Sequence, residues 1–132
     1  MRILGIDLGR KRIGLALGDT ESRIAIGLPT LQNDRHVMDN LQAVIKGERI
    51  QKLIVGLPKT MSGETGEQVR YTQKWADKIS NLLDVEVVYE DERLSSKMAR
   101  DGLLSLGHKL KKEDIDQAAA VLILQSYLDR AN

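Results

Sequence analysis

Three short apolar runs open the chain, and the connections between them are too short to hold a helix. The runs cover residues 2–8, 13–17 and 24–28, and Gly9-Arg10-Lys11-Arg12 forms the first connection. Short runs joined by small glycine-containing turns are typical of strands that pair antiparallel. The first third of the chain therefore predicts an antiparallel meander of three strands.

The middle of the chain changes to a helical period. Val37, Leu41, Val44 and Ile45 recur at helical spacing, which predicts a helix over residues 35–47 with Asn33 or Asp34 as N-cap. Residues 52–55 form a short strand of the buried type. The loop at 59–66 holds two glycines without apolar periodicity, and we expect it to be mobile. A second helix is predicted over 67–82, with inward side chains at Val69, Trp75, Ala76, Ile79 and Leu82.

One more strand and two helices complete the pattern. The strand is expected at residues 85–89, a third helix from Ser95 or Ser96 to about Gly107, and the last helix over 114–128. Strand–helix–strand segments supply parallel strands by right-handed crossover. The prediction is an α/β fold whose mixed five-stranded sheet has three antiparallel N-terminal strands and two parallel later strands, flanked by helices. A length of 132 residues suits a single domain, 1–132.

Composition removes several classes of function. Twenty basic and nineteen acidic residues give a formal charge of +1, so no global field attracts nucleic acid or membrane. The absence of cysteine excludes disulfides, thiolate chemistry and Cys-based zinc sites. The chain starts without a signal-peptide layout and has no apolar stretch of roughly 18 residues. We therefore expect a cytoplasmic protein without membrane contact.

Asp7 lies where a carboxylate is costly. It stands between Ile6 and Leu8 in a predicted central strand, and an unpaired buried carboxylate would cost several kcal/mol. A structural Asp that accepts backbone N–H bonds is one interpretation. The following Gly9 favours another, because a residue without a Cβ lets a phosphate or a metal ion approach the strand end.

Asp91 and Glu92 follow the last predicted strand. Acids after a strand are common in solvated surface loops, but ligands of α/β sheets gather beyond the carboxyl ends of strands, which is where this pair falls. Strand alternation would direct the two side chains to opposite faces, so we expect only one of them to be a ligand.

Asp116 is the third acid, in the first turn of the last predicted helix. An acid there can simply complement the helix dipole, although Asp114 fits that role equally well. Asp116 shares a stripe with residues three, four, seven and eleven positions later, which are Ala119, Ala120, Ile123 and Tyr127. The small alanines would let the helix lie close to the sheet and bring this carboxylate toward the strand ends.

The three acids together predict a metal site. Clustered carboxylates raise one another's pKa unless a cation joins them. Oxygen ligands without His or Cys suit a hard ion, Mg²⁺ or Mn²⁺. Two such ions roughly 3.5–4 Å apart can activate a water and stabilise the leaving oxygen during phosphodiester hydrolysis.

Basic residues lie near each acid in the sequence. A charge run is usually a solvated face, but three clusters beside three acids are better explained as a rim that follows a phosphate backbone. Low aromatic content argues against a base-stacking platform. His36 and His108 are expected on the surface. The basic residues are Arg10, Lys11 and Arg12 after Asp7, Arg93, Lys97 and Arg100 after the acidic pair, and Lys109, Lys111 and Lys112 before Asp116.

Four motifs resemble the YqgF/RuvX family in the right order across essentially the whole chain. They are residues 5–14 (GIDLGRKRIG), 55–58 with 61–63 (VGLP and MSG), 91–94 (DERL), and 115–116 before Ala118 and Ala119. The resemblance implies an RNase H-like fold, relatedness to the RuvC Holliday junction resolvases, and a bacterial cytoplasmic nuclease that matures the 5′ end of small-subunit ribosomal RNA. Ser95 stands where the family usually has threonine, and this serine keeps the hydroxyl group.

The expected function is thus a divalent-metal-dependent nuclease. Asp7, Asp116 and one of Asp91 and Glu92 would hold Mg²⁺ or Mn²⁺. The substrate would be precursor 16S ribosomal RNA or branched DNA, and the protein a monomer or a homodimer. The loop beginning at Lys59 would close over the substrate. Nucleic-acid contacts are expected from Arg10, Lys11, Arg12, Lys59, Arg93 and Lys97.

Two other classes of function remain open. A nucleic-acid-binding module without catalysis, acting in transcription or ribosome assembly, would explain the basic clusters but gives no reason to keep three acids. Gly5-Ile6-Asp7-Leu8-Gly9 also resembles the first phosphate motif of actin-like ATPases and sugar kinases. Those proteins bind nucleotide between two lobes, whereas this chain has room for one and lacks a Walker-type sequence.

Overall fold

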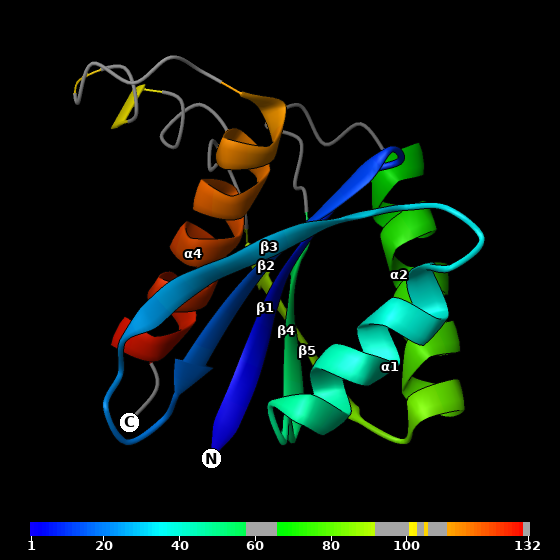
Figure 1. Cartoon of the computed structure of the whole chain (residues 1–132), viewed down its shortest axis with the longest axis horizontal. Helices are drawn as coiled ribbons and strands as arrows, with labels where there is room; N and C mark the ends of the chain where they lie inside the picture. The colour runs from blue at the N-terminus through cyan, green and yellow to red at the C-terminus, as the bar shows by residue number, and fades with distance from the viewer. Residues whose placement is uncertain (58–65, 92–100, 103–104, 106–110, 131–132) are drawn as a thin grey trace.

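A five-stranded mixed sheet forms the centre of the computed structural model, which describes residues 1–57, 66–91, 101–102, 105 and 111–130 (Figure 1). The strands are β1 (Arg2–Leu8), β2 (Arg12–Asp19), β3 (Ala25–Gln32), β4 (Lys52–Leu57) and β5 (Glu86–Asp91), in the order β3-β2-β1-β4-β5. β1 pairs antiparallel with β2, and β2 with β3, while β4 runs parallel to β1 and β5 parallel to β4. The predicted combination of three antiparallel and two later parallel strands is confirmed.

β1 has the predicted bounds, whereas the other four strands extend beyond the apolar runs that predicted them. Asp19 pairs with Arg2, Gln32 pairs with Arg12, and Asp91 pairs with Leu57. Because the ladder is made of backbone hydrogen bonds, it continues past the last apolar side chain wherever the partner strand continues. Apolar periodicity therefore identified all five strands of the sheet but placed the ends of β2, β3, β4 and β5 too early.

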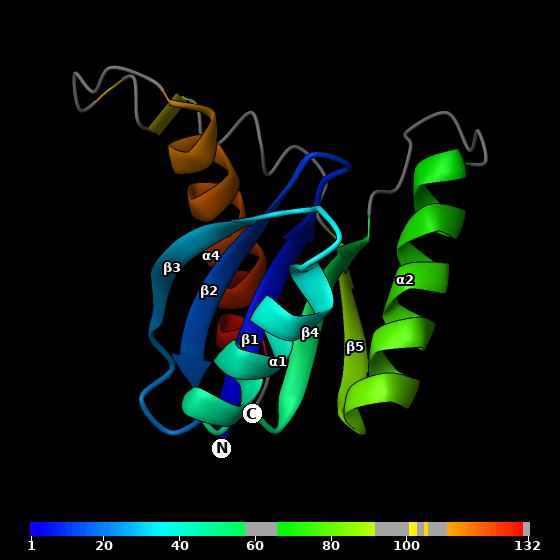
Figure 2. The ribbon, with the colours of Figure 1, turned by 45° about the vertical axis from the view of Figure 1, so that its right-hand side comes forward.

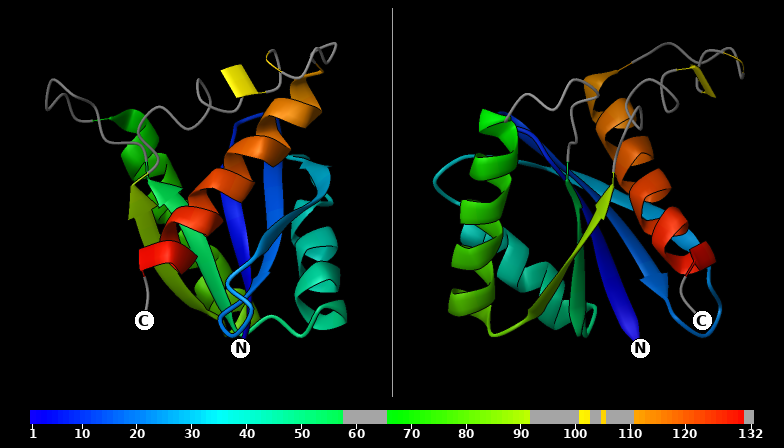
Figure 3. Two further views of the ribbon diagram at one scale, coloured as in Figure 1. Left: turned by 90° about the vertical axis from the view of Figure 1, so that its left-hand side faces the viewer. Right: turned by 180° about the vertical axis from the view of Figure 1, so that it is seen from behind.

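Helices cover both faces of the sheet. The helices α1 (Val37–Gly47) and α2 (Glu67–Leu83) lie on one face, and α4 (Lys112–Arg130) lies on the other (Figures 2 and 3). Two separate apolar clusters correspond to these faces, one under α1 and α2 and a smaller one under α4. None of the helices in the described part of the chain is long and apolar enough to cross a membrane.

Details of two helices differ from the prediction. The N-cap of α1 is His36 rather than Asn33 or Asp34, because both of those side chains bond elsewhere: Asn33 to Gly9 and Tyr71, and Asp34 Oδ1 to the His36 N–H at 2.9 Å. In α2, Leu82 is 61% exposed and not inward. Leu83, four residues after the buried Ile79, packs against the core instead. The predicted third helix and the loop at 59–66 fall almost wholly outside the described residues.

Strand alternation decides which side chains meet α4. Ile3 belongs to the cluster under α4, whereas Leu4, Ile6 and Leu8 belong to the cluster under α1 and α2. A Cβ on Gly5 would lie 2.7 Å from the Leu124 Cβ of α4, so Gly5 also faces α4. Since side chains two residues apart share a face, Asp7 lies on the α4 side of the sheet.

Candidate active site

Asp7 lies near the carboxyl end of the central strand. It is partly buried in β1, and its antiparallel partner in β2 is Gly14. The parallel strands β4 and β5 end at the same edge of the sheet, and the orange N-terminal end of α4 lies at that edge as well (Figure 3). Asp7 is thus placed where an α/β sheet offers its ligand-binding edge.

Gly14 brings Asp116 to the same place. A Cβ on Gly14 would overlap the backbone carbonyl of Asp116, so helix α4 rests directly on the strand at this point. One turn later, the Ala120 carbonyl oxygen lies 3.1 Å from the Cβ position of Gly5. Gly5 lies two residues before Asp7 in β1, and Ala120 lies four residues after Asp116 in α4. The strand and the helix therefore carry their two acids toward the same end of the sheet, on the same face.

Arg12 neutralises Asp116 in this arrangement. Its Nε donates a hydrogen bond of 2.7 Å to Asp116 Oδ2, and both side chains are only 22% exposed. Arg12 shares a strand face with Gly14, two residues further along β2, so its side chain also lies on the α4 side. Asp114, the other acid considered for the helix dipole, is exposed, whereas Asp116 is partly buried, as expected.

The turn between β1 and β2 is fixed by side chains from elsewhere. Gly9 N–H donates to the Arg12 carbonyl at 3.0 Å, and Asn33 Nδ2 donates to the Gly9 carbonyl at 2.9 Å. The same Asn33 group donates to the Tyr71 hydroxyl at 3.0 Å, and the Arg10 guanidinium lies 4.4 Å from the centre of the Tyr71 ring. Local sequence patterns gave no signal for Tyr71 and suggested only a helix cap for Asn33, because the contacts of both residues join segments far apart in the chain.

The two acids considered at the end of β5 differ in what the structure describes. Asp91 is exposed and pairs with Leu57. Val87 and Tyr89 pack against the cluster under α1 and α2, so alternation places Asp91 on that face and not on the face of Asp7 and Asp116. Glu92 lies outside the described residues, as do Lys59, Arg93 and Lys97.

Sequence reasoning missed the acid before this pair. Glu90 is only 5% exposed and lies on the α4 face, where Ser126 Oγ donates to Oε2 at 2.9 Å and Arg130 Nη2 donates to Oε1. A buried carboxylate with two donors is satisfied, and it ties the last turns of α4 to β5. Strand alternation could have identified Glu90, because it lies two residues after Val88 and therefore on the same face of β5.

The acidic side chains at this edge of the sheet offer oxygen atoms as metal ligands. Asp7 and Asp116 supply carboxylates, which suit Mg²⁺ or Mn²⁺. Within the described ranges, no three His, Asp or Glu side chains gather closely enough to hold a metal ion. His36 is exposed, as expected, and His108 lies outside those ranges.

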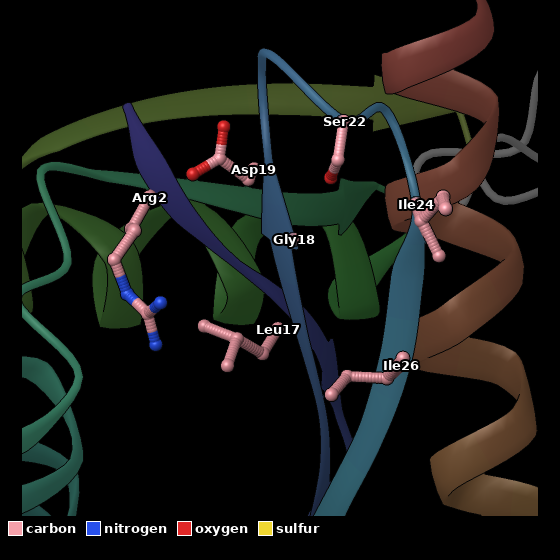
Figure 4. A pocket seen from close by; sticks show the side chains of 7 residues that line it. All are labelled: Arg2, Leu17, Gly18, Asp19, Ser22, Ile24 and Ile26. Atoms are coloured by element: carbon pink, nitrogen blue, oxygen red, sulfur yellow. The ribbon is translucent and has the colours of Figure 1, made fainter.

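A small pocket lies at the opposite end of the sheet. Its volume is about 290 Å³, and it lies beside the start of β1, where Arg2 pairs with Asp19 (Figure 4). The lining is mostly apolar, and Asp19 is its sole carboxylate. The pocket therefore lacks the paired acids of the Asp7 end. Its lining residues are Arg2, Leu17, Gly18, Asp19, Ser22, Ile24 and Ile26.

One ionisable group on the α1 and α2 face has a shifted pKa. Burial raises the pKa of the Tyr89 phenol above its ordinary value, and the neighbouring Asp77 carboxylate raises it further. Both influences favour the neutral phenol, so this group carries no charge near neutral pH.

Two known proteins are similar to this chain over nearly its whole length. A protein from Sulfurihydrogenibium sp. (strain YO3AOP1) is 44% identical over 98% of this chain and 90% of its own length, and one from Caldanaerobacter subterraneus subsp. tengcongensis is 39% identical over 98% and 96%. Both carry the name "Putative pre-16S rRNA nuclease". These names agree with the nuclease class predicted from the sequence.

The fold matches a solved structure of RuvC from T. thermophilus in complex with a Holliday junction substrate. The TM-score is 0.60 at 16% identity, over 100% of this chain and 98% of that one. This likeness confirms the predicted RNase H-like fold. The family model for RuvX, described as Holliday junction resolvase, matches residues 1–130. The resemblance seen in the four motifs is therefore confirmed, and this chain belongs to the RuvX family.

Proposed function

We propose that this chain is a divalent-metal-dependent nuclease that hydrolyses phosphodiester bonds of structured nucleic acid. One observation carries the proposal: a single glycine, Gly14, is both the strand partner of Asp7 and the contact of the Asp116 backbone. Two carboxylates from opposite parts of the chain are thereby held at one polar edge. The family and the names of its relatives support the same enzyme class.

Asp7, Asp116 and Glu92 are the residues we propose as ligands for Mg²⁺ or Mn²⁺. Alternation along β5 places Asp91 on the face away from Asp7 and Asp116, which favours Glu92 of the two acids as the ligand. A cation held by carboxylates would activate a water for attack and stabilise charge on the leaving oxygen. The contribution of the chain is to fix the carboxylates on a strand and a helix, whose rigidity keeps them in position.

Basic groups at this edge are proposed to hold the phosphate backbone. Arg10 and Lys11 are exposed in the turn after β1, and Lys111 and Lys112 are exposed at the start of α4. Since β1 and α4 carry the two acids, these cations flank the proposed reaction centre. Stacking on Tyr71 orders Arg10 before nucleic acid arrives, which lowers the entropy cost of binding. Further contacts are proposed from Arg12, Lys59, Arg93 and Lys97.

The proposed substrate is precursor 16S ribosomal RNA, cleaved toward its 5′ end during ribosome biogenesis in the cytoplasm. The names of the curated relatives support this choice. Branched DNA is the second candidate, supported by the description of the family. We further propose that residues 1–132 act as one RNase H-like domain. An RNA processor can act as a monomer, whereas symmetric cutting of a junction requires a two-fold homodimer.

A cleavage assay on both substrates tests the proposal. Wild-type protein is incubated with precursor ribosomal RNA and with a four-way junction, in Mg²⁺, in Mn²⁺ and in EDTA. Cleavage that needs the cation, and that falls at least about 100-fold in Asp7→Asn and in Asp116→Asn, is the expected result. Size-exclusion chromatography of each complex reports the oligomeric state.

Two further variants separate the acids at the end of β5. Glu92→Gln is expected to lose cleavage as Asp116→Asn does, while Asp91→Asn keeps most of it. Circular dichroism checks that each variant is folded. Nucleic-acid binding unchanged by EDTA, with no cleavage by the wild type, would instead identify a binding module without catalysis.

A further inference from the structure

Arg12 and Asp116 form an ion pair inside the proposed reaction centre. The Arg12 Nε–Asp116 Oδ2 distance is 2.7 Å, and the two residues lie 104 positions apart in the sequence. Hydrogen bonds between charged groups are roughly twice as strong as neutral ones. The pair therefore holds helix α4 to strand β2 at the position of the acid.

This pair is more enclosed than two other ion pairs of the sheet. Both of its side chains are 22% exposed, whereas Arg2 and Glu48 are 42% and 38% exposed. In the pair of Lys52 and Glu86, Lys52 is 18% exposed but Glu86 is 64% exposed. Water screens exposed pairs and makes them weak. The Arg12 charge consequently acts on the Asp116 carboxylate with less screening than those surface pairs experience.

The same carboxylate is the one proposed to bind a divalent cation, and this inference rests on that proposed function. A metal ion needs oxygen lone pairs, and Asp116 Oδ2 already accepts a hydrogen bond from Arg12. A fixed positive charge at that oxygen also repels a second cation. We propose that Arg12 is a built-in counter-ion, which competes with the divalent cation for Asp116 and sets the affinity of the site for metal.

The competition gives Arg12 two states. Without metal, Arg12 balances the Asp116 charge and keeps the carboxylate in place. When a cation is bound, the Arg12 guanidinium would be released from Asp116 and would join Arg10 and Lys11 as a group available to backbone phosphate. Arg12 thereby acts on the reaction through the affinity of Asp116 for the cation.

A purely structural role for Arg12 makes the opposite prediction. If the ion pair served only to orient Asp116, its loss would loosen the carboxylate and weaken metal binding. Competition predicts tighter binding when the charge is removed. The sign of the change in metal affinity therefore separates the two roles.

The test uses the full chain, stripped of metal with EDTA and then dialysed, and Mn²⁺ as the probe in isothermal titration calorimetry. Arg12→Gln removes the charge, Arg12→Met removes it while keeping an unbranched apolar stem, and Arg12→Lys keeps it. Arg2→Gln is the matched control, since it deletes an equal charge and an ion pair to Glu48 at the other end of β1. Thermal unfolding with and without Mn²⁺ gives a second readout.

Both neutral variants are expected to bind Mn²⁺ about fivefold more tightly than the wild type. Arg12→Lys should remain within about twofold of the wild type, and Arg2→Gln should not change the affinity. In metal-free buffer, the neutral variants are expected to unfold roughly 3 °C lower, and Mn²⁺ should raise their unfolding temperature more than it raises that of the wild type.

The failure of this inference differs from the failure of the proposed function. Equal or weaker Mn²⁺ binding by Arg12→Gln and Arg12→Met, beside a wild type that binds Mn²⁺ and cleaves, overturns the counter-ion role alone. A wild type that neither binds Mn²⁺ nor cleaves nucleic acid overturns both proposals.

Discussion

On the α4 face of the sheet, glycines at positions 5, 14 and 18 let the backbone and leucine side chains of α4 approach the strands closely. On the face of α1 and α2, large side chains such as Leu41 and Ile79 fill the space. The first face holds the smaller apolar cluster and both described acids of the proposed site. The two faces of the sheet therefore contribute differently to stability and to the proposed site. The α1 and α2 face supplies most of the buried apolar surface, and the α4 face supplies the position of a functional carboxylate.

A Gly14→Ala substitution is expected to have the largest effect on activity. Its new Cβ would overlap the Asp116 carbonyl, so α4 must shift away from β2 and take Asp116 away from Asp7. A displacement of about 1 Å in a reaction centre can cost roughly 100-fold in rate. Overpacking should also lower the free energy of unfolding by about 1–3 kcal/mol. Cleavage rate per folded molecule and urea unfolding measure the two effects.

Gly47→Ala is the matched control. A Cβ on Gly47 would meet no atom within 4 Å, so this variant should keep both activity and stability. Full activity in Gly14→Ala would show that the close approach of α4 does not position Asp116, and the contrast between the faces would lose its functional meaning.

A Leu41→Ala substitution on the other face should reverse the pattern. Leu41 is fully buried in the cluster under α1 and α2, and truncating such a side chain leaves a cavity that costs about 2–5 kcal/mol of unfolding free energy. Because Asp7 and Asp116 lie on the opposite face, the cleavage rate of the folded molecules should be unchanged at a temperature well below the transition.

Leu82→Ala serves as its control, since Leu82 is 61% exposed and its truncation should change stability by no more than about 0.5 kcal/mol. A large loss of intrinsic rate in folded Leu41→Ala would contradict the division between the faces.

Tyr71 connects the two faces of the sheet, because it joins α2 on one face to the turn that follows Asp7. Tyr71→Leu removes both the ring under Arg10 and the hydroxyl that accepts from Asn33. A cation–π contact at an exposed site contributes about 0.5–1 kcal/mol, so nucleic-acid affinity in EDTA should fall about two- to fivefold. Tyr71→Phe keeps the ring and should lose less. Equal losses in the two variants would assign the effect to the hydroxyl rather than to Arg10. Fluorescence anisotropy with a labelled RNA hairpin measures both.

Tyr89→Phe is expected to have the smallest effect, and only at alkaline pH. The raised pKa of Tyr89 means that the folded protein favours the neutral phenol, so its contribution to stability is complete below the unfolded pKa and is lost as pH rises through the folded pKa. Wild-type stability should therefore fall slightly more than that of Tyr89→Phe above about pH 10. Urea unfolding at pH 8 and pH 10.5 checks the difference, and parallel pH dependence in the two proteins would contradict it.

The sequence predicted the sheet, and it singled out the acids of the proposed site, for a physical reason. Asp7 and Asp116 stood out because each interrupts an otherwise apolar pattern, and patterns of period two and 3.6 directly encode which face a residue occupies. Strand ends were underestimated because backbone pairing continues through polar residues such as Gln32. Leu82 was predicted to point inward because the apolar stripe of the helix does not show which of the adjacent Leu82 and Leu83 faces the core.

Contacts between distant segments could not be predicted. Arg12 was expected to contact the phosphate backbone, and nothing in its neighbourhood indicates a partner 104 positions later. The same holds for Asn33, which a local rule assigned to the N-cap of α1 and which instead holds the turn at Gly9. Glu90 was overlooked because its donors, Ser126 and Arg130, come from α4. Such partners are fixed only when the tertiary fold is complete.

The position of β1 at the centre of the sheet has a consequence for timing. Its edges are filled by β2 and β4, and its α4 face is closed by the last described helix. Contacts between segments so far apart in sequence carry a loop-closure cost before they stabilise the fold, which slows folding. If Asp7 and Asp116 act together as proposed, the reaction centre is complete only once α4 has docked against β1 and β2.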